Sequence, residues 1–302
     1  MQRHGTPRAR LAHAARRGAI CLAFVGAAGG VRAQEILPND FVPAPAGTNV
    51  ALAYYLYGHN TSFSLAGGPT YRANTGLETH LGIARFVHYN KLGDFPVGVQ
   101  VFQVFGALSG GRVGGQNLGS SFGVTNLALS AFIWPYSNDQ SKTHLGLFGY
   151  IYPPTGTYDR DKAINIGDNR WRGTVQVGLN QGFGERVSVD AGLDVTFYGD
   201  NTRPIAGRRF SQSPSYRFQT FVNYGWTKTF VTSLGYQAIL GGDQKLDGVF
   251  NGNRTELQRV RAAASYFWTP TFQTVLEVDR DIQVVGGFKQ AIGAQLRLLY
   301  VF

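Results

Sequence analysis

The chain has 302 residues, of which 15% are charged and 43% are hydrophobic, and its formal net charge is +10. Soluble domains have about 25% charged residues, so this composition disfavours a cytosolic α/β enzyme and a coiled coil. A mean hydropathy of −0.12 is also too polar for a bundle of transmembrane helices. The 40 glycines and the 13% aromatic content instead favour many short strands, each with an apolar and a polar face.

Residues 1–33 have the pattern of a secretory signal peptide. Five arginines and no acidic residue precede an apolar run from Gly18 to Val31, and Ala33 places a small residue at the expected cleavage position. The run is too short for a transmembrane anchor, which needs about 20 residues. Cys21 stands too near its beginning for a lipoprotein anchor. We therefore expect export and cleavage after Ala33.

Removal of this segment changes the charge and thiol content. It holds six of the 28 basic residues and the only cysteine, so the mature chain has 22 basic against 18 acidic residues, a net charge of +4, and no thiol. This balance gives no support to a nucleic-acid partner. Residues 34–46 are rich in proline, and we expect a periplasmic extension or a short lumen plug, ahead of one domain over 47–302.

Alternation of apolar and polar residues with a period of two predicts twelve β-strands in the mature chain. Seven of the segments alternate well, whereas 76–89, 96–107 and 256–268 are equivocal, and Val97–Phe105 is apolar on both faces. In the clearest, Val187 to Tyr198, one face carries valine, leucine and phenylalanine, and the other carries serine, aspartate and threonine. Short turns alternate with loops of about 13 to 18 residues. The predicted strands are 48–57, 76–89, 96–107, 123–134, 143–152, 171–182, 187–198, 215–226, 230–240, 256–268, 272–282 and 288–302.

This pattern predicts an all-β fold: a transmembrane up-and-down antiparallel β-barrel in the bacterial outer membrane. A sheet that crosses hydrocarbon must close, because an open edge would leave backbone N–H and C=O groups unpaired. In such barrels the long loops are extracellular and the short turns periplasmic. The final strand ends on Phe302 and resembles the assembly signal of outer-membrane proteins. The expected partners are therefore the barrel-assembly machinery, outer-membrane lipids and a small-molecule solute.

The polar faces of the predicted strands carry charged residues, which a wet lumen accommodates better than the dry core of a soluble barrel. The lumen-lining candidates are Arg172, Asp190, Asp194, Arg217, Arg259, Arg261, Glu277, Asp279, Asp281, Lys289 and Arg297.

A tight turn at 269–271 would place Arg261 opposite Asp279 and Arg259 opposite Asp281, with Lys289 of the last strand in reach of Asp281. These residues form either a charged wall that orders permeating groups or a structural ladder.

Aromatic residues near the ends of the strands are expected to form the interfacial girdles of the barrel. They are Tyr54, Tyr57, Tyr89, Trp134, Trp171, Trp226, Trp268 and Tyr300.

The mature sequence shows no motif of a catalytic or metal site. Its four histidines, His59, His80, His88 and His144, lack the spacing of metal ligands, and the glycine-rich stretch 110–119 lacks the lysine of a phosphate loop. A lipase-type enzyme would need a serine and a histidine in hydrogen-bond reach, and the predicted strand pairing brings no such pair together. We expect no cofactor, no metal and no enzymatic activity; an outer-membrane lipase is the disfavoured alternative.

Three blocks of the sequence resemble a known family. They are residues 152–159 (Tyr-Pro-Pro-Thr-Gly-Thr-Tyr-Asp), 165–171 (Asn-Ile-Gly-Asp-Asn-Arg-Trp) and 197–202 (Phe-Tyr-Gly-Asp-Asn-Thr). They are similar to blocks of the phenol meta-pathway degradation family of outer-membrane transporters. The resemblance implies a channel for small apolar or aromatic compounds.

The first two blocks contain turn formers that can fold a long loop back on itself. The candidates for such a loop clamp are Pro154, Thr155, Gly156, Asn165, Gly167, Asn169, Arg170 and Trp171. The clamp is either a functional constriction or a structural feature.

The loop 199–214 holds Arg203, Arg208 and Arg209 against Asp200. It either contacts lipopolysaccharide phosphates, with which arginine pairs well, or is a solvated loop.

Three functions stay open. A transporter for apolar or aromatic compounds rests on the resemblance. A narrow general porin would show steady ion conductance. A sealed barrel that serves adhesion or membrane integrity would show neither conductance nor an uptake defect.

Export makes a direct prediction about the purified protein. N-terminal sequencing of the protein from outer membranes should begin at Gln34, because the signal peptide is removed after Ala33. A mature protein that still carries Met1 would contradict export by a cleaved signal.

Overall fold

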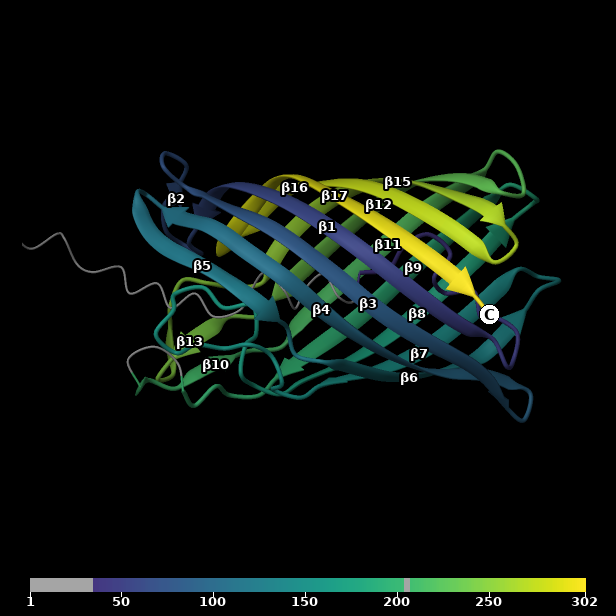
Figure 1. Cartoon of the computed structure of the whole chain (residues 1–302), viewed down its shortest axis with the longest axis horizontal. Helices are drawn as coiled ribbons and strands as arrows, with labels where there is room; N and C mark the ends of the chain where they lie inside the picture. Colours follow the sequence, from purple (N-terminus) through teal and green to yellow (C-terminus); the bar gives the residue numbers. More distant parts are fainter. Residues whose placement is uncertain (1–34, 204–206) are drawn as a thin grey trace, which may run out of the picture.

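The computed structural model describes residues 35–203 and 207–302, and the predicted signal peptide lies outside them. Within the described residues, twelve long strands form a closed antiparallel barrel (Figure 1), which confirms the predicted fold. β1 pairs with β17 and so closes the sheet. The barrel strands are β1 (Asn49–Ser64), β3 (Gly76–Leu92), β4 (Phe95–Val113), β6 (Ala128–Asn138), β7 (Thr143–Tyr152), β8 (Arg172–Phe183), β9 (Val187–Tyr198), β11 (Ser215–Gly225), β12 (Phe230–Gly241), β15 (Glu256–Thr269), β16 (Phe272–Val285) and β17 (Gly287–Val301).

The two ends of the barrel differ. Short turns join β3 to β4, β6 to β7, β8 to β9, β11 to β12 and β15 to β16, and the C-terminus lies at the same end, on the right of Figure 1. Long loops gather at the other end, where β10 (Phe210–Gln212), β13 (Gln244–Leu246) and β14 (Val249–Phe250) form a small separate sheet. The described part of the chain has no helix long and apolar enough to cross a membrane.

One part of the predicted topology is wrong. The glycine-rich stretch 110–119 was expected to be a loop, but it continues β4 into a hairpin with β5 (Gln116–Val124). Gly114 and Gly115 both have positive φ angles, of 59° and 86°, which a tight hairpin turn requires. β6 therefore begins at Ala128, not at 123, and pairs with β4 only over residues 97–102. A short strand, β2 (Thr70–Tyr71), extends β1 in a similar way.

The two faces of the wall are inverted relative to a soluble barrel. On β9, Leu193 and Phe197 are exposed on the outer surface, while Asp190 and Asp194 are buried inside. The same alternation recurs along β8 and β11. On these three strands apolar side chains face outward and polar ones face the lumen, as expected where the outside solvent is lipid.

The register of β15 and β16 is confirmed: Arg259 stands opposite Asp281, and Arg261 opposite Asp279. The turn itself is irregular. Thr269 pairs with Phe272, one position from the residue that an even register would place there.

Lys289 is wrongly predicted to line the lumen. Its ammonium group is exposed and donates a hydrogen bond to the carbonyl oxygen of Ile282 at 2.6 Å. Gln290 takes the interior place instead. A bulge on β17 lies between Ile292, opposite His59, and Gln290, opposite Asn60. Ile292 is exposed and Gln290 is buried, so the one-residue irregularity exchanges the two faces of the strand at this point.

Three of the expected girdle aromatics also face the lumen. Trp134 is 1% exposed, and Tyr54 and Tyr89 pack with it in one interior cluster. Trp134 shares its face with Phe132, two residues before it, so strand parity and not proximity to the strand end decides the side. Trp171, Trp226, Trp268 and Tyr300 are exposed on the outer surface.

We expect a disulfide to lock the closing seam. Leu52 in β1 stands opposite Leu299 in β17, and opposed Cα atoms lie about 4.5–5.5 Å apart, a distance that a disulfide spans. The double variant Leu52→Cys/Leu299→Cys should oxidise to an intramolecular disulfide, seen as a gel shift that a reductant reverses. Leu52→Cys/Leu298→Cys, with side chains on opposite faces, is the control. Free thiols in the first variant would contradict the closure.

Candidate functional site

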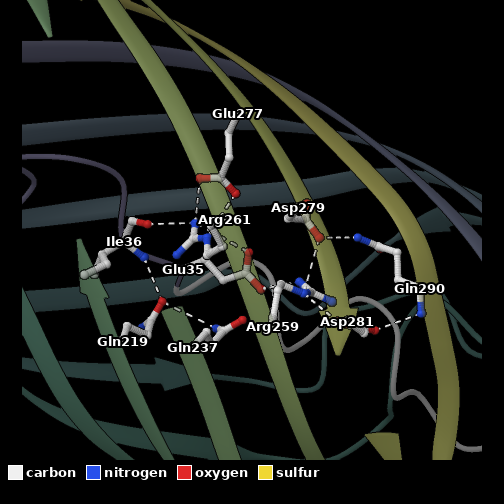
Figure 2. A network of polar contacts seen from close by, with 10 residues as sticks. All are labelled: Glu35, Ile36, Gln219, Gln237, Arg259, Arg261, Glu277, Asp279, Asp281 and Gln290. Carbon is white, nitrogen blue, oxygen red and sulfur yellow. Dashed lines mark hydrogen bonds and ion pairs between the residues drawn. The ribbon is translucent and has the colours of Figure 1, made fainter. Parts of the chain in front are cut away.

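Ten of the eleven lumen-lining candidates are buried inside the barrel, all except Lys289. Arg259 pairs with Asp281 at 2.7 Å and with Asp279 at 3.3 Å. Arg261 pairs with Glu277 at 2.8 Å, although Asp279 stands opposite it in the ladder. Figure 2 shows that Glu35 joins the two groups of side chains in one polar network. The other candidates are Arg172 on β8, Asp190 and Asp194 on β9, Arg217 on β11 and Arg297 on β17.

Residues 35–41 lie inside the barrel as a plug segment. Glu35 pairs with Arg259 at 3.1 Å. The backbone of Ile36 is held on both sides, because its N–H donates to Gln219 Oε1 at 3.1 Å and its carbonyl oxygen accepts from Arg261 Nη2 at 2.9 Å (Figure 2). Of the two alternatives for the proline-rich segment, an extension or a plug, the contacts of residues 35–41 favour the plug.

The second half of the plug segment crosses to other strands. The Asn39 N–H donates to Asp190 at 2.8 Å, and Asp40 pairs with Arg297 at 2.6 Å. The Phe41 ring lies 5.6 Å from that of Phe148. The Trp134 indole N–H donates to the Phe41 carbonyl oxygen at 2.8 Å. The segment is therefore tied to the wall on several sides of the lumen.

The lumen has two chemically distinct sides. β8, β9, β11, β15, β16 and β17 carry all of the buried charged candidates, and Arg85 is the one luminal charge on β3. β3, β4, β6 and β7 carry an interior aromatic group instead: Tyr89, Phe102, Phe132, Trp134, Phe148, Tyr150 and Tyr152. The plug segment uses both sides, with its carboxylates on the charged side and its phenyl ring on the aromatic side.

The predicted clamp folds the loop 153–171 against the barrel mouth. Asn126, between β5 and β6, is its centre: its Oδ1 accepts from the Gly156 N–H at 3.1 Å, and its Nδ2 donates to Asp168 Oδ1 and to the Arg170 carbonyl oxygen, both at 2.8 Å. Gly156 and Gly167 touch backbone to backbone, where a Cβ on either would come within 2.9 Å of the other.

Arg170 ties the clamp to a neighbouring loop. Its guanidinium stacks between the rings of Tyr198 at 4.7 Å and Phe210 at 4.9 Å, and donates to Gln212 at 2.6 Å. Burial lowers the pKa of the Arg170 guanidinium, and the Asp168 carboxylate opposes that shift.

The remaining clamp candidates make fewer contacts. Thr155 accepts a hydrogen bond from the Leu127 N–H. Asn165 bonds within its own loop, and Asn169 donates to Asn201. Pro154 and the Trp171 indole are exposed. Sequence reasoning missed Asn126, Asp168 and Gln212. The first and last lie outside the matching blocks, so only the folded contacts reveal them.

The arginines of the loop 199–214 have partners of their own. Arg209 pairs with Asp200, and Arg208 pairs with Asp247 of the β13–β14 turn at 2.8 Å. The hydrogen bond from Arg208 holds the pKa of the exposed Asp247 carboxyl below its usual value. Over residues 35–203 and 207–302, no group of three or more histidine, cysteine or acidic residues is arranged to hold a metal ion.

We expect Asn126→Ala to loosen the clamp without opening the barrel. The substitution leaves three polar groups without their partner, and each such buried group costs about 1–3 kcal/mol. Trypsin should then cleave faster at Arg160 and Lys162 of the loop in intact outer membranes, while the barrel keeps its heat-dependent gel mobility. Asn117→Ala, at the exposed start of β5, is the matched control. Cleavage at the wild-type rate would contradict a holding role for Asn126.

Comparison with known proteins gives consistent matches. The profile of the family described as MetA-pathway of phenol degradation matches residues 54–298. The solved COG4313 outer membrane channel from Pseudomonas putida F1 has a TM-score of 0.84 at 30% identity, covering 89% of this chain and 100% of that chain. The transport unit of the autotransporter AIDA-I from Escherichia coli shares the fold alone, with a TM-score of 0.50 at 9% identity over 90% of this chain and 94% of that chain. No curated protein sequence matches the chain.

The family match runs from β1 to β17 and so spans nearly the whole barrel. Together with the solved relative, it locates the protein in the bacterial outer membrane, among channels and not among enzymes. The chain therefore belongs to the MetA-pathway of phenol degradation family.

Proposed function

We propose that the barrel passes small organic solutes across the outer membrane through its lumen, and that the plug segment closes this path from the periplasmic side. The observation that carries the proposal is the interior itself, which is lined by buried polar and charged side chains while the outer surface is apolar. Barrels that pass solutes have this polar interior. The clamp covers the opposite mouth.

Aromatic compounds are the favoured solute class within this proposal. The aromatic side of the lumen already receives one ring, that of Phe41, against Phe148 and Trp134. Aromatic pairs at such distances contribute about 0.5–1.5 kcal/mol beyond their buried area. A solute ring that replaced Phe41 would meet the same partners.

The plug segment is held firmly enough that the path is closed at rest. Ile36, Leu37 and Phe41 are almost fully buried, and full burial of such a side chain contributes about 1.5–3 kcal/mol. The segment also stays covalently attached, which keeps its effective concentration high. Opening therefore requires a solute that competes for the same contacts.

A narrow general porin is the alternative that the charged side of the lumen favours, since that side would pass ions whenever the segment leaves. A sealed barrel is the third reading, because both ends are covered. We also propose contacts with lipopolysaccharide by the loop 199–214, and with the assembly machinery by the C-terminal strand, whose Tyr300 and Phe302 are exposed.

Deletion of residues 35–41 tests the proposal. In planar bilayers the deletion variant should conduct several-fold more than the wild type, because the segment no longer fills the lumen. Cells with the wild-type protein should take up a labelled aromatic compound faster at low concentration than cells without it. The clamp variant Asn126→Ala tells whether the extracellular mouth also limits flux.

Each alternative has its own outcome. Equal uptake with and without the protein, combined with clear conductance, would leave the porin. Absence of conductance in both the deletion variant and Asn126→Ala would leave the sealed barrel.

A further inference from the structure

The luminal arginines differ in where their counter-charge comes from. Four of them pair with a carboxylate of the barrel or its loops: Arg172 with Asp168, Arg217 with Asp194, Arg259 with Asp281 and Arg261 with Glu277. Arg297 does not. Among the described residues, its ion-pair partner is Asp40 of the plug segment, at 2.6 Å.

Arg85 on β3 likewise lacks a carboxylate partner on the described barrel wall. Its Nη1 donates to the Tyr54 hydroxyl at 3.3 Å. Asp40 interacts electrostatically with both Arg85 and Arg297. The Nε–H groups of both arginines are buried and donate to no protein acceptor. We call these two residues the arginine pair.

If the plug segment left the lumen, the arginine pair would lose the counter-charge of Asp40. The two guanidinium groups, which repel one another electrostatically, would remain in the barrel interior without a counter-charge, and buried charges are stable only when they are paired. An open lumen therefore needs another anion at the position of the Asp40 carboxylate. A carboxylate suits the site best, because an arginine fork can bind both of its oxygens.

A slot for a ring adjoins the arginine pair. The Phe41 ring, one residue from Asp40, lies against bare backbone on β8 and β9. A Cβ at Gly178 would come within 2.1 Å of this ring, and one at Gly192 within 3.0 Å. Phe148 faces the ring from the aromatic side. The wall thus leaves space for one aromatic ring beside a site for one carboxylate.

We propose that the arginine pair and the Phe41 slot form a binding site for a small aromatic carboxylate, and that Asp40 and Phe41 occupy this site in the closed barrel. The inference rests on the proposed function and names the solute class of the same lumen. The plug segment is then a built-in competing ligand, which such a solute displaces by supplying the same two chemical groups.

Trp134 offers a readout of displacement that does not depend on transport. It is 1% exposed and bonded to the Phe41 carbonyl oxygen, whereas Trp171, Trp226 and Trp268 are more than half exposed. Titration of the folded protein in detergent with benzoate should change the tryptophan emission. Benzamide, which has the same ring without the charge, should not. Trp134→Phe should abolish the change.

Two variants test the carboxylate position. Asp40→Asn should bind benzoate about tenfold more tightly or better, because it removes a competing charge-assisted bond and lies outside the barrel wall. Arg297→Gln, checked for folding by heat-dependent gel mobility, should lose the benzoate response.

A third variant tests the ring slot. Gly178→Ala should weaken benzoate binding but leave acetate binding unchanged. Gly173→Ala on the same strand, where a Cβ would have no neighbour closer than 3.8 Å, is the control.

An equal response to benzamide and benzoate, or equal benzoate affinity in Asp40→Asn and the wild type, would overturn the proposal. Its failure is separable from that of the proposed function. Uptake without Arg297-dependent binding would refute only the site, whereas binding without flux would refute only the transport.

Discussion

Backbone hydrogen bonding inside hydrocarbon is the constraint from which the rest of this structure follows. Each N–H and C=O in the membrane needs a partner in the protein, and the pairing of β1 with β17 satisfies the last free edge. Closure separates two solvents. Lipid selects Leu193 and Phe197 for the outside, and the polar face of the same strand, with Asp190 and Asp194, must then gather inside.

Charges confined in this way must neutralise one another. β15 and β16 do so by direct opposition, with Arg259 and Arg261 among three carboxylates. Where the wall lacks a carboxylate, the chain brings one from its N-terminal end, and Asp40 reaches Arg297. The same segment thereby both balances the interior charge and fills the lumen. Neutralisation and occlusion are thus two effects of one set of contacts.

Local patterns predicted much of the fold. β7 and β9 have the bounds that alternation indicates, because residues on a strand with lipid on one side and polar groups on the other alternate strictly. The wrong predictions concern residues whose side or pairing depends on a bulge or a turn and not on the alternation along one strand. A bulge in the β1–β17 pairing decides the side of Lys289, and a two-glycine turn converts a loop into β5. The clamp blocks were visible in the sequence, but their partner Asn126 is a contact made only by folding.

The position of the plug segment imposes an order on biogenesis. Asp40 precedes Arg297 by 257 residues, and Glu35 precedes Arg259 by 224. The nascent chain therefore emerges with its N-terminal end long before the strands that receive it exist. Asn49 and Phe302 exchange backbone hydrogen bonds at the rim that the chain passes on its way into the lumen. The pairing of β1 with β17 and the insertion of the plug segment therefore take place at the same rim of the barrel. If β1 paired with β17 first, the plug segment would have to enter through the closed rim. Its contacts with the wall would then form late and over a long sequence separation, which carries an entropic cost.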